Sequence, residues 1–271
     1  MHSSNSKTSQ DDNFKTVVWW SVLASIASFN CLLWAYTYNS LLDSDDLSSY
    51  TQRHLFLSGI YTVVCAYRSI LPRIDLERTC LFDTQWSSIF LGRASATIAE
   101  ISFAAQLALL LHEWSTRYDH VLSYWFSYLI VPLLTTAQGC CWYGLLSQNH
   151  LAHAVEESIW AMTVGGMCVL FVPFILYESG HVVWQALLGV LMSVVYCTFM
   201  ITVDVPMYLT RWRENEKMRG KKNILYSVKD SWRRRVVTKD WNVWKPEVAW
   251  LTGYFSCAVW TSIALCHVTR Y

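Results

Sequence analysis

The chain has 271 residues, of which 54% are hydrophobic and only 15% are charged. These proportions lie well away from the averages of soluble globular proteins, so they exclude an ordinary water-soluble domain and favour a membrane protein. The formal net charge is +1, but the charges are unevenly placed, since the segment 211–245 holds more than half of all Lys and Arg. Long apolar stretches beside one basic segment are typical of membrane proteins.

Seven apolar stretches have the length that crosses a hydrocarbon core about 30 Å thick, and we predict a helix for each. The predicted spans, in chain order, are 17–36, 55–71, 86–111, 121–146, 151–177, 182–208 and 248–268. The second span is short and carries Arg68, whose side chain can reach the headgroups by snorkelling. The expected fold class is therefore all-α, a polytopic membrane protein with a bundle of about seven transmembrane helices.

The basic loops predict the orientation of the chain, because Lys and Arg accumulate on the cytoplasmic side of membranes. With seven spans, the N-terminal tail, the loop after the second span and the loop after the sixth span share one side, and all three carry basic residues. The opposite side receives the acidic Asp43, Asp45 and Asp46. We expect a cytoplasmic N-terminus and a C-terminus on the opposite side, in the endoplasmic reticulum or the plasma membrane.

Polar composition divides the rest of the chain. Residues 1–16 are rich in Ser, Asn, Asp and Lys, and we expect them to form a disordered cytoplasmic tail. Residues 17–271 are expected to form a single transmembrane domain, with a basic cytoplasmic loop at 209–247. In that loop Trp and aliphatic residues are interleaved with positive charges, so it could lie on the membrane as an amphipathic helix. Anionic lipid is the expected partner rather than nucleic acid, and a purely topogenic role is the alternative.

The nine cysteines do not suggest a disulfide framework. Their number is odd and most of them lie within predicted spans. Cys140 and Cys141 are adjacent and therefore point about 100° apart on a helix. We interpret them as small, packed apolar residues.

The third predicted span carries two charged residues, Arg93 and Glu100. A charge at the centre of a bilayer costs roughly 2.5 to 3.5 kcal/mol on the insertion scale, so each one calls for an explanation. A separation of seven residues places both on one helical face, about 10 Å apart along the axis. From that spacing we expect no direct salt bridge between them.

The fifth predicted span begins with the densest polar cluster near any membrane boundary of this chain. His150, His153 and Glu157 fall within an arc of about 60° on a helix, whereas Glu156 is expected to point elsewhere. One helical face would thus carry two imidazoles and a carboxylate. Histidine changes its charge near neutral pH, so this combination is suited to proton transfer.

Depth relates these residues to others on neighbouring spans. Counted at about 1.5 Å per residue from the basic side, Arg93 and Glu157 lie about 10 Å into the membrane. Gln138 on the fourth span and Asp204 on the sixth lie at roughly the same depth. Asp204 precedes Pro206, which could kink the helix. Four helices could therefore present polar groups to one pocket open to the cytoplasm. Glu100 lies deeper and could mark its floor or a separate proton site.

These positions define the candidate site and its alternatives. We predict a protein that binds or acts on a lipid or another lipophilic small molecule by acid/base chemistry. The predicted catalytic residues are His153, Glu157, Asp204 and Glu100, and the predicted substrate-binding residues are Arg93, Gln138 and His150. A proton-coupled transporter or channel is the first alternative, and a structural ion-pair network without activity is the second.

A metal site is a narrower version of the enzyme hypothesis. His150, His153 and Glu157 have a spacing that allows ligation, but no H-E-x-x-H string occurs, and two interfacial histidines without a metal are the preferred explanation. The last span, 248–268, excludes two known classes of seven-span protein. It lacks the lysine of retinal-binding rhodopsins and the H-x-x-x-H motif of lipid hydrolases of the alkaline ceramidase and progestin-receptor type, since His267 stands alone. The sequence therefore identifies no metal and no cofactor.

Overall fold

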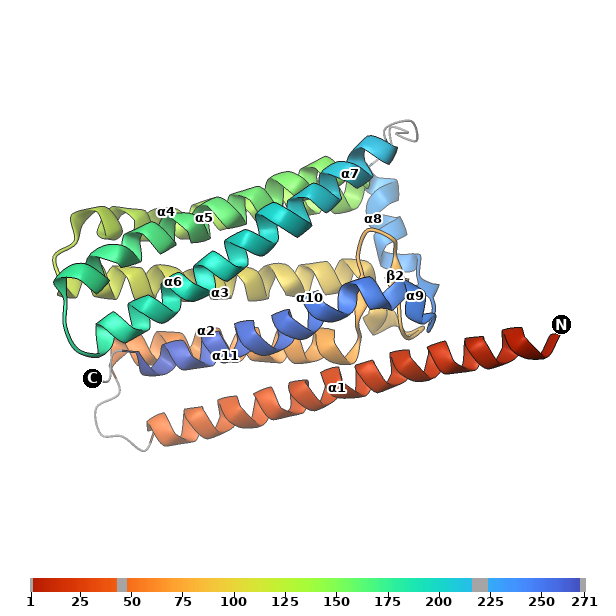
Figure 1. Cartoon of the computed structure of the whole chain (residues 1–271), viewed down its shortest axis with the longest axis horizontal. Coiled ribbons are helices and arrows are strands. Elements are labelled where there is room, and N and C mark those ends of the chain that lie inside the picture. The colour runs from red at the N-terminus through yellow and green to blue at the C-terminus, as the bar shows by residue number, and fades with distance from the viewer. Residues whose placement is uncertain (1, 43–47, 216–223, 269–271) are drawn as a thin grey trace. The chain divides into compact units, whose positions relative to one another are not determined.

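The computed structural model describes residues 2–42, 48–215 and 224–268, and almost all of them are helical (Figure 1). The prediction of an all-α fold is confirmed. Within the described residues, six helical segments are long and apolar enough to cross a membrane. They are Asp11–Leu42, Ile89–Arg117, Val121–Ser147, His150–Tyr177, His181–Glu214 and Trp241–His267.

The chain divides into two compact units. Unit 1 comprises Met1–Phe103 and Lys229–His267, and unit 2 comprises Ala104–Val228 and Val268–Tyr271. Helix α3 (Ile89–Arg117) therefore contributes its first half to unit 1 and its second half to unit 2. The prediction that residues 17–271 form a single domain would require the two units to act as one, and it stays a prediction.

Unit 1 is built on two long helices and the C-terminal helical segment. Helices α1 and α2 pack against each other and against α11 (Figure 1). The elements are α1 (His2–Leu42), α2 (Ser49–Ile70), α9 (Trp241–Trp244), the 3-10 turn η4 (Lys245–Glu247), α10 (Val248–Gly253), the π-helical η5 (Tyr254–Ala258), α11 (Val259–Ala264) and η6 (Leu265–His267). Their buried core centres on Trp19, Tyr61, Trp244 and Phe255, each at most 6% exposed. Helix α1 begins at His2 and so includes residues 2–16, whose composition indicates a disordered tail.

Helix α2, the second of the seven predicted spans, is not among the six segments that qualify by length and apolarity. It has 22 residues, but its first turns contain Gln52, Arg53 and His54, which lower its mean hydropathy. Its start is well defined, because the Ser48 side chain accepts a hydrogen bond from the Thr51 amide, as expected of a helix N-cap. The count of seven spans stays a prediction.

Three two-residue strands join the loops of unit 1. Strand β1 (Arg73–Ile74) pairs antiparallel with β2 (Thr79–Cys80), and β2 pairs parallel with β3 (Val236–Val237). The buried Arg78 guanidinium reaches Asp230 at 3.4 Å, and burial lowers its pKa while Asp230 opposes that effect. The loop after α2 and the segment after α8 (Ile224–Arg233) are thus held together.

Unit 2 is organised around helix α5, which packs against α4, α6 and α7 (Figure 1). A tight turn joins α4 to α5: Gln148 adopts the left-handed conformation that ends α4, and Asn149 caps α5 by accepting a hydrogen bond from the Leu151 amide at 3.1 Å. The elements are α4 (Val121–Ser147), α5 (His150–Tyr177), α6 (His181–Phe199), the π-helical η2 (Met200–Asp204) and α7 (Val205–Asn215).

The irregularity predicted near Pro206 takes the form of a π-helical turn. Segment η2 ends at Asp204, two residues before the proline. Proline lacks the amide that would bond to the carbonyl four residues earlier, so the helix widens there. The turn places Asp204 and Tyr208 alongside α5, against which both η2 and α7 pack.

Candidate functional site

The candidate site is a buried polar cluster in unit 2, which we call the His153 cluster. It consists of Cys141 on α4, His153 and Glu156 on α5, Asp204 at the end of η2, and Tyr208 on α7. Cys141, His153 and Glu156 are 1%, 5% and 3% exposed. Five ionisable side chains are thus gathered on helices that are apolar enough to cross a membrane.

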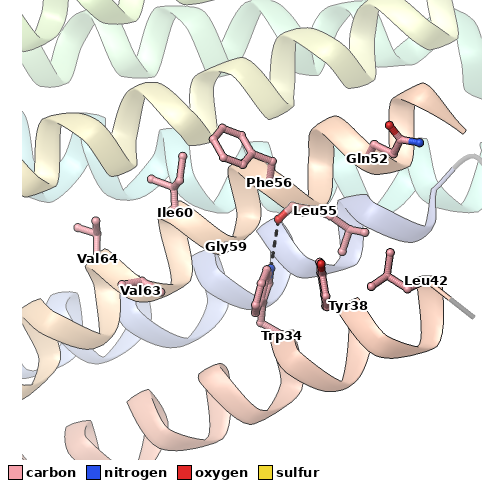
Figure 2. A pocket seen from close by; sticks show the side chains of 10 residues that line it. All are labelled: Trp34, Tyr38, Leu42, Gln52, Leu55, Phe56, Gly59, Ile60, Val63 and Val64. Carbon is pink, nitrogen blue, oxygen red and sulfur yellow. Dashed lines mark hydrogen bonds between the residues drawn. The ribbon is translucent and has the colours of Figure 1, made fainter. Parts of the chain in front are cut away.

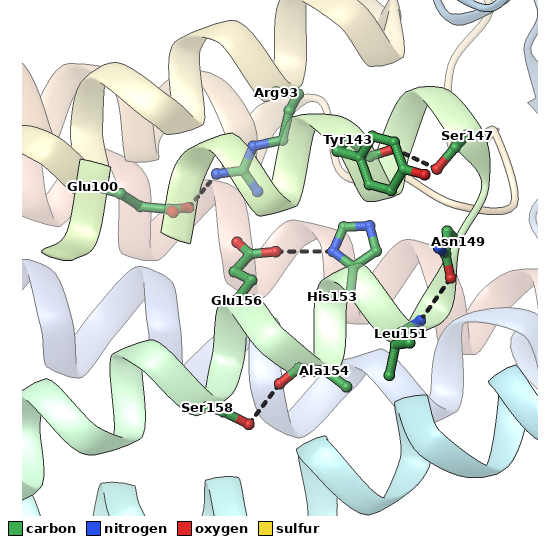
Figure 3. A network of polar contacts seen from close by, with 10 residues as sticks. All are labelled: Arg93, Glu100, Tyr143, Ser147, Asn149, Leu151, His153, Ala154, Glu156 and Ser158. Carbon is green, nitrogen blue, oxygen red and sulfur yellow. Dashed lines mark hydrogen bonds and ion pairs between the residues drawn. The ribbon is translucent and has the colours of Figure 1, made fainter. Parts of the chain in front are cut away.

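The shortest contact in the cluster joins His153 to Glu156. The Nδ1 atom of His153 lies 2.9 Å from Oε2 of Glu156, one helical turn further along α5 (Figure 3). Residues at i and i+3 are neighbours on a helix surface, so this pair forms within a single element. The other ring nitrogen, Nε2, is buried and has no hydrogen-bond partner among the described residues.

Neighbouring helices fix the position of the imidazole. The Tyr208 ring stacks on it, with ring centroids 5.3 Å apart and planes inclined by 23°. On the α4 side, a Cβ atom at Gly144 would lie only 2.7 Å from Cδ2 of His153. Only glycine can occupy position 144 while the ring keeps this place, because real Cβ contacts are not that short.

Asp204 brings a second carboxyl group to the cluster. It interacts electrostatically with Glu156, with His153 and with Arg211. Asp204 and His153, both predicted as catalytic, are therefore close in the structure.

The remaining predicted residues of unit 2 lie around the cluster. The His150 ring is 6.4 Å from the Tyr208 ring, Glu157 is half-buried and interacts electrostatically with Tyr208, and Gln138 is buried on α4, 3% exposed. The expectation that Glu156 points away from the histidines is wrong. From His153, Glu156 and Glu157 lie about 60° and 40° away on opposite sides, so helical angle alone does not select between them.

Arg93 and Glu100 belong to unit 1, where they pair with each other. The Arg93 Nη2 atom donates to Oε1 of Glu100 at 2.7 Å (Figure 3). The expectation of no direct salt bridge is therefore wrong. The axial rise of about 10 Å is bridged because both side chains are long and helical side chains at the later position lean back toward the N-terminus.

The pocket predicted to join four helices divides between the two units. Arg93 and Glu100 belong to unit 1, whereas Gln138, His153 and Asp204 belong to unit 2. A common pocket for all of them stays a prediction.

An apolar groove of about 760 Å³ lies between α1 and α2 in unit 1 (Figure 2). Its lining includes Trp34, whose indole donates to the Leu55 carbonyl at 3.3 Å, and Gly59, against which that indole packs. Among the described residues, no acidic, basic or histidine side chain lines it. Its mostly apolar lining can accommodate apolar chains.

Metal-ligand geometry identifies a residue that the sequence did not. Among the described residues, Cys141, His153 and Glu156 each offer one ligand atom, and these atoms lie within 4.8 Å of one another. Cys141 carried no signal, because one cysteine on an apolar helix resembles any other. An i, i+12 relation across a helical hairpin becomes visible only once the turn at residues 148–149 is known.

Comparisons with protein-family models, with curated proteins and with solved structures find no match to this chain. Its function is therefore inferred from the geometry of the His153 cluster and from the arrangement of its helices.

Proposed function

We propose that the chain is a multi-pass membrane protein with seven spans, namely the six long apolar segments and α2. Two contacts within unit 1 support a spanning α2. Near one end Trp20 of α1 donates to the Ile70 carbonyl at 2.9 Å, and toward the other end Trp34 donates to the Leu55 carbonyl. Helix α2 thus runs antiparallel to α1 along its apolar stretch, so it crosses whatever α1 crosses.

The polar side chains of α2 are compatible with this proposal. His54, Ser58 and Thr62 are at most 1% exposed, so they face protein within unit 1 and not lipid. A helix of 22 residues is about 33 Å long, enough for a hydrocarbon core about 30 Å thick. Mean hydropathy therefore underestimates how well α2 suits a membrane span, because the average includes polar side chains that pack against protein and do not contact lipid.

We propose a cytoplasmic N-terminus, with anionic lipid as the partner of the basic segment 209–247. With seven spans, this segment and the loop after α2 lie on one side, which agrees with the pairing of β2 with β3. Helix α8 exposes Leu225, Tyr226 and Trp232 by 79%, 64% and 47%. Exposed apolar side chains beside basic ones are typical of helices that lie on an anionic membrane surface.

We propose that the His153 cluster binds or transforms a lipid or another lipophilic small molecule by acid/base chemistry. The observation that carries this proposal is the buried, hydrogen-bonded His153–Glu156 pair beside Asp204, inside membrane-length helices. Burying such groups costs several kcal/mol, and ionisable residues at membrane depth are functional by default. A carboxylate that orients an imidazole through one ring nitrogen leaves the other for a ligand.

Roles follow from the contacts. His153 and Asp204 are the proposed proton-transfer groups, and Glu156 is the proposed positioning residue because it bonds to Nδ1. His150, Gln138 and Glu157 are proposed to line the approach. For Arg93 and Glu100 a structural role is the second candidate, favoured by their direct pairing on one helix.

The test is a search for the bound molecule. The full chain is purified in lipid nanodiscs, and the organic extract is compared by mass spectrometry between wild type, Asp204→Asn and a control, Glu113→Gln, which alters a more exposed carboxylate of α3. We expect one lipophilic species, enriched over bulk lipid in wild type and control, to fall at least about tenfold in Asp204→Asn, a loss of about 1.4 kcal/mol. The same species in equal amounts in all three samples would contradict the proposal.

A further inference from the structure

The α4–α5 hairpin of unit 2 brings three metal-binding side chains together. Cys141 comes from α4, and His153 and Glu156 come from the first two turns of α5. All three are more than nine-tenths buried, and their ligand atoms lie within 4.8 Å of one another. Because the turn is tight and capped by Asn149, the register between the two helices is fixed.

We propose that Cys141, His153 and Glu156 bind a divalent metal ion of the zinc class. Thiolate, imidazole and carboxylate are the three donor types that Zn²⁺ takes in proteins, at about 2.3, 2.0 and 2.0–2.2 Å. This inference deepens the proposed function, on which it rests for the location of the site. It names a cofactor that the sequence does not indicate.

The geometry needs little adjustment. Ligand atoms around a tetrahedral Zn²⁺ are roughly 3.3 to 3.8 Å apart, as follows from those bond lengths. The Nδ1 atom of His153 and Oε2 of Glu156 are already 2.9 Å apart, and the Cys141 sulfur lies within 4.8 Å of its partners. Reaching tetrahedral spacing from these separations requires the ligand atoms to move by roughly 1 Å.

Charge supports a cation at this position. A thiolate and a carboxylate together carry two negative charges, which a divalent ion cancels. The ion with these two ligands is therefore neutral, and this favours binding because a net charge is costly to bury. Asp204 adds a further acidic group that interacts with His153 and Glu156. If His153 served as a ligand of such an ion, Asp204 would remain as the proton-transfer group of the proposed function.

A hydrogen-bonded pair alone does not explain the third member of the group. His153 and Glu156 can bond to each other without Cys141, whereas a metal site needs the thiol beside them. Cys140, next in sequence, is only half-buried and is not part of the group. The chain therefore provides a matched pair of adjacent cysteines for the test.

The experiment measures metal in the full-length protein purified in detergent. Wild type, Cys141→Ser, His153→Asn and the control Cys140→Ser are loaded with Zn²⁺ or Co²⁺ and desalted, and their metal content is determined by elemental mass spectrometry. We expect wild type and Cys140→Ser to retain the ion in stoichiometric amount. In Cys141→Ser and His153→Asn the affinity should fall by more than the roughly 10–100-fold that outer partners contribute.

The Co²⁺ spectrum provides a second readout. Because it is recorded on the wild type as well, it tests the inference even where a variant does not fold. Wild type should show a thiolate-to-cobalt absorption band that Cys141→Ser lacks and Cys140→Ser keeps. Wild-type protein without retained metal and without this band would overturn the inference, as would equal retention by Cys141→Ser. Neither readout depends on a bound lipophilic molecule, so failure of this inference is distinguishable from failure of the proposed function.

Discussion

At residue 144 the absence of a side chain decides where the His153 ring lies. The ring fills the space that a Cβ atom would take, and this position allows Nδ1 to meet Glu156. Glycine in a helix interior is otherwise unfavourable by roughly 0.5–1 kcal/mol relative to alanine. The His153 cluster thus uses a residue that the helix itself disfavours.

Gly144→Ala is expected to displace the imidazole and destabilise unit 2 by about 1–3 kcal/mol, as overpacking does. The matched control is Gly139→Ala on the same helix, where an added Cβ meets nothing within 4 Å. The control should keep or raise the melting temperature in detergent, because alanine is the better helix former. Equal melting temperatures for the two variants would contradict the placement of His153.

Glu100→Gln tests the ion pair of unit 1. The side chains of Arg93 and Glu100 are 9% and 13% exposed, so removing the carboxylate leaves a largely buried guanidinium without its charge partner, at a cost of about 3 to 5 kcal/mol. Glu113→Gln breaks the more exposed Glu113–Arg117 pair and should change stability by at most about 1 kcal/mol. Thermal unfolding in detergent compares them, and similar melting temperatures would refute a buried pair.

The individual site residues were predictable to different degrees. Depth predicts Asp204 at the level of Glu157, about one helical turn after His153, because rise per residue is the same in every helix. The choice of Glu156 over Glu157 did not follow, since both flank His153 on the helix surface. The salt bridge of Arg93 was missed because axial distance ignores the reach of long side chains.

At the scale of elements, hydropathy locates the long helices well. Helix α4 begins at Val121 and α5 ends at Tyr177, both as predicted. The strands β1, β2 and β3 could not be predicted, because two-residue strands have no periodicity to detect. The pairing of β2 with β3 also depends on loops that are more than 150 residues apart in sequence.

The basic segment provides a prediction at this scale. Replacing Arg233 and Arg234, both exposed, by glutamine should reduce enrichment of anionic lipid around the protein by about 1 kcal/mol per charge. The effect should shrink at high salt because the charges are screened. Lipid enrichment is measured by mass spectrometry of nanodiscs of mixed composition. Arg117→Gln, at the end of α3 on the side assigned as opposite, is the control, and an equal effect there would contradict the assignment.

At the scale of the whole molecule, the order of spans fixes which loops share a side. Single cysteines introduced at the exposed Glu77 and Lys239 should react with an impermeant maleimide only from the cytoplasmic side, and one at the exposed Ser179 only from the other. Wild type gives the background of the native cysteines. Reaction of all three positions from one side would rule out the seven-span topology.

The central claim is that the His153 cluster holds a non-protein group inside the membrane. The most direct measurement is an experimental density map of the full chain in lipid nanodiscs. The account predicts seven helices in the bilayer and density, not explained by protein, in contact with His153, Glu156 or Asp204. A map in which protein side chains alone fill and close the cluster, in wild-type protein purified with its native lipids and metals, would contradict it.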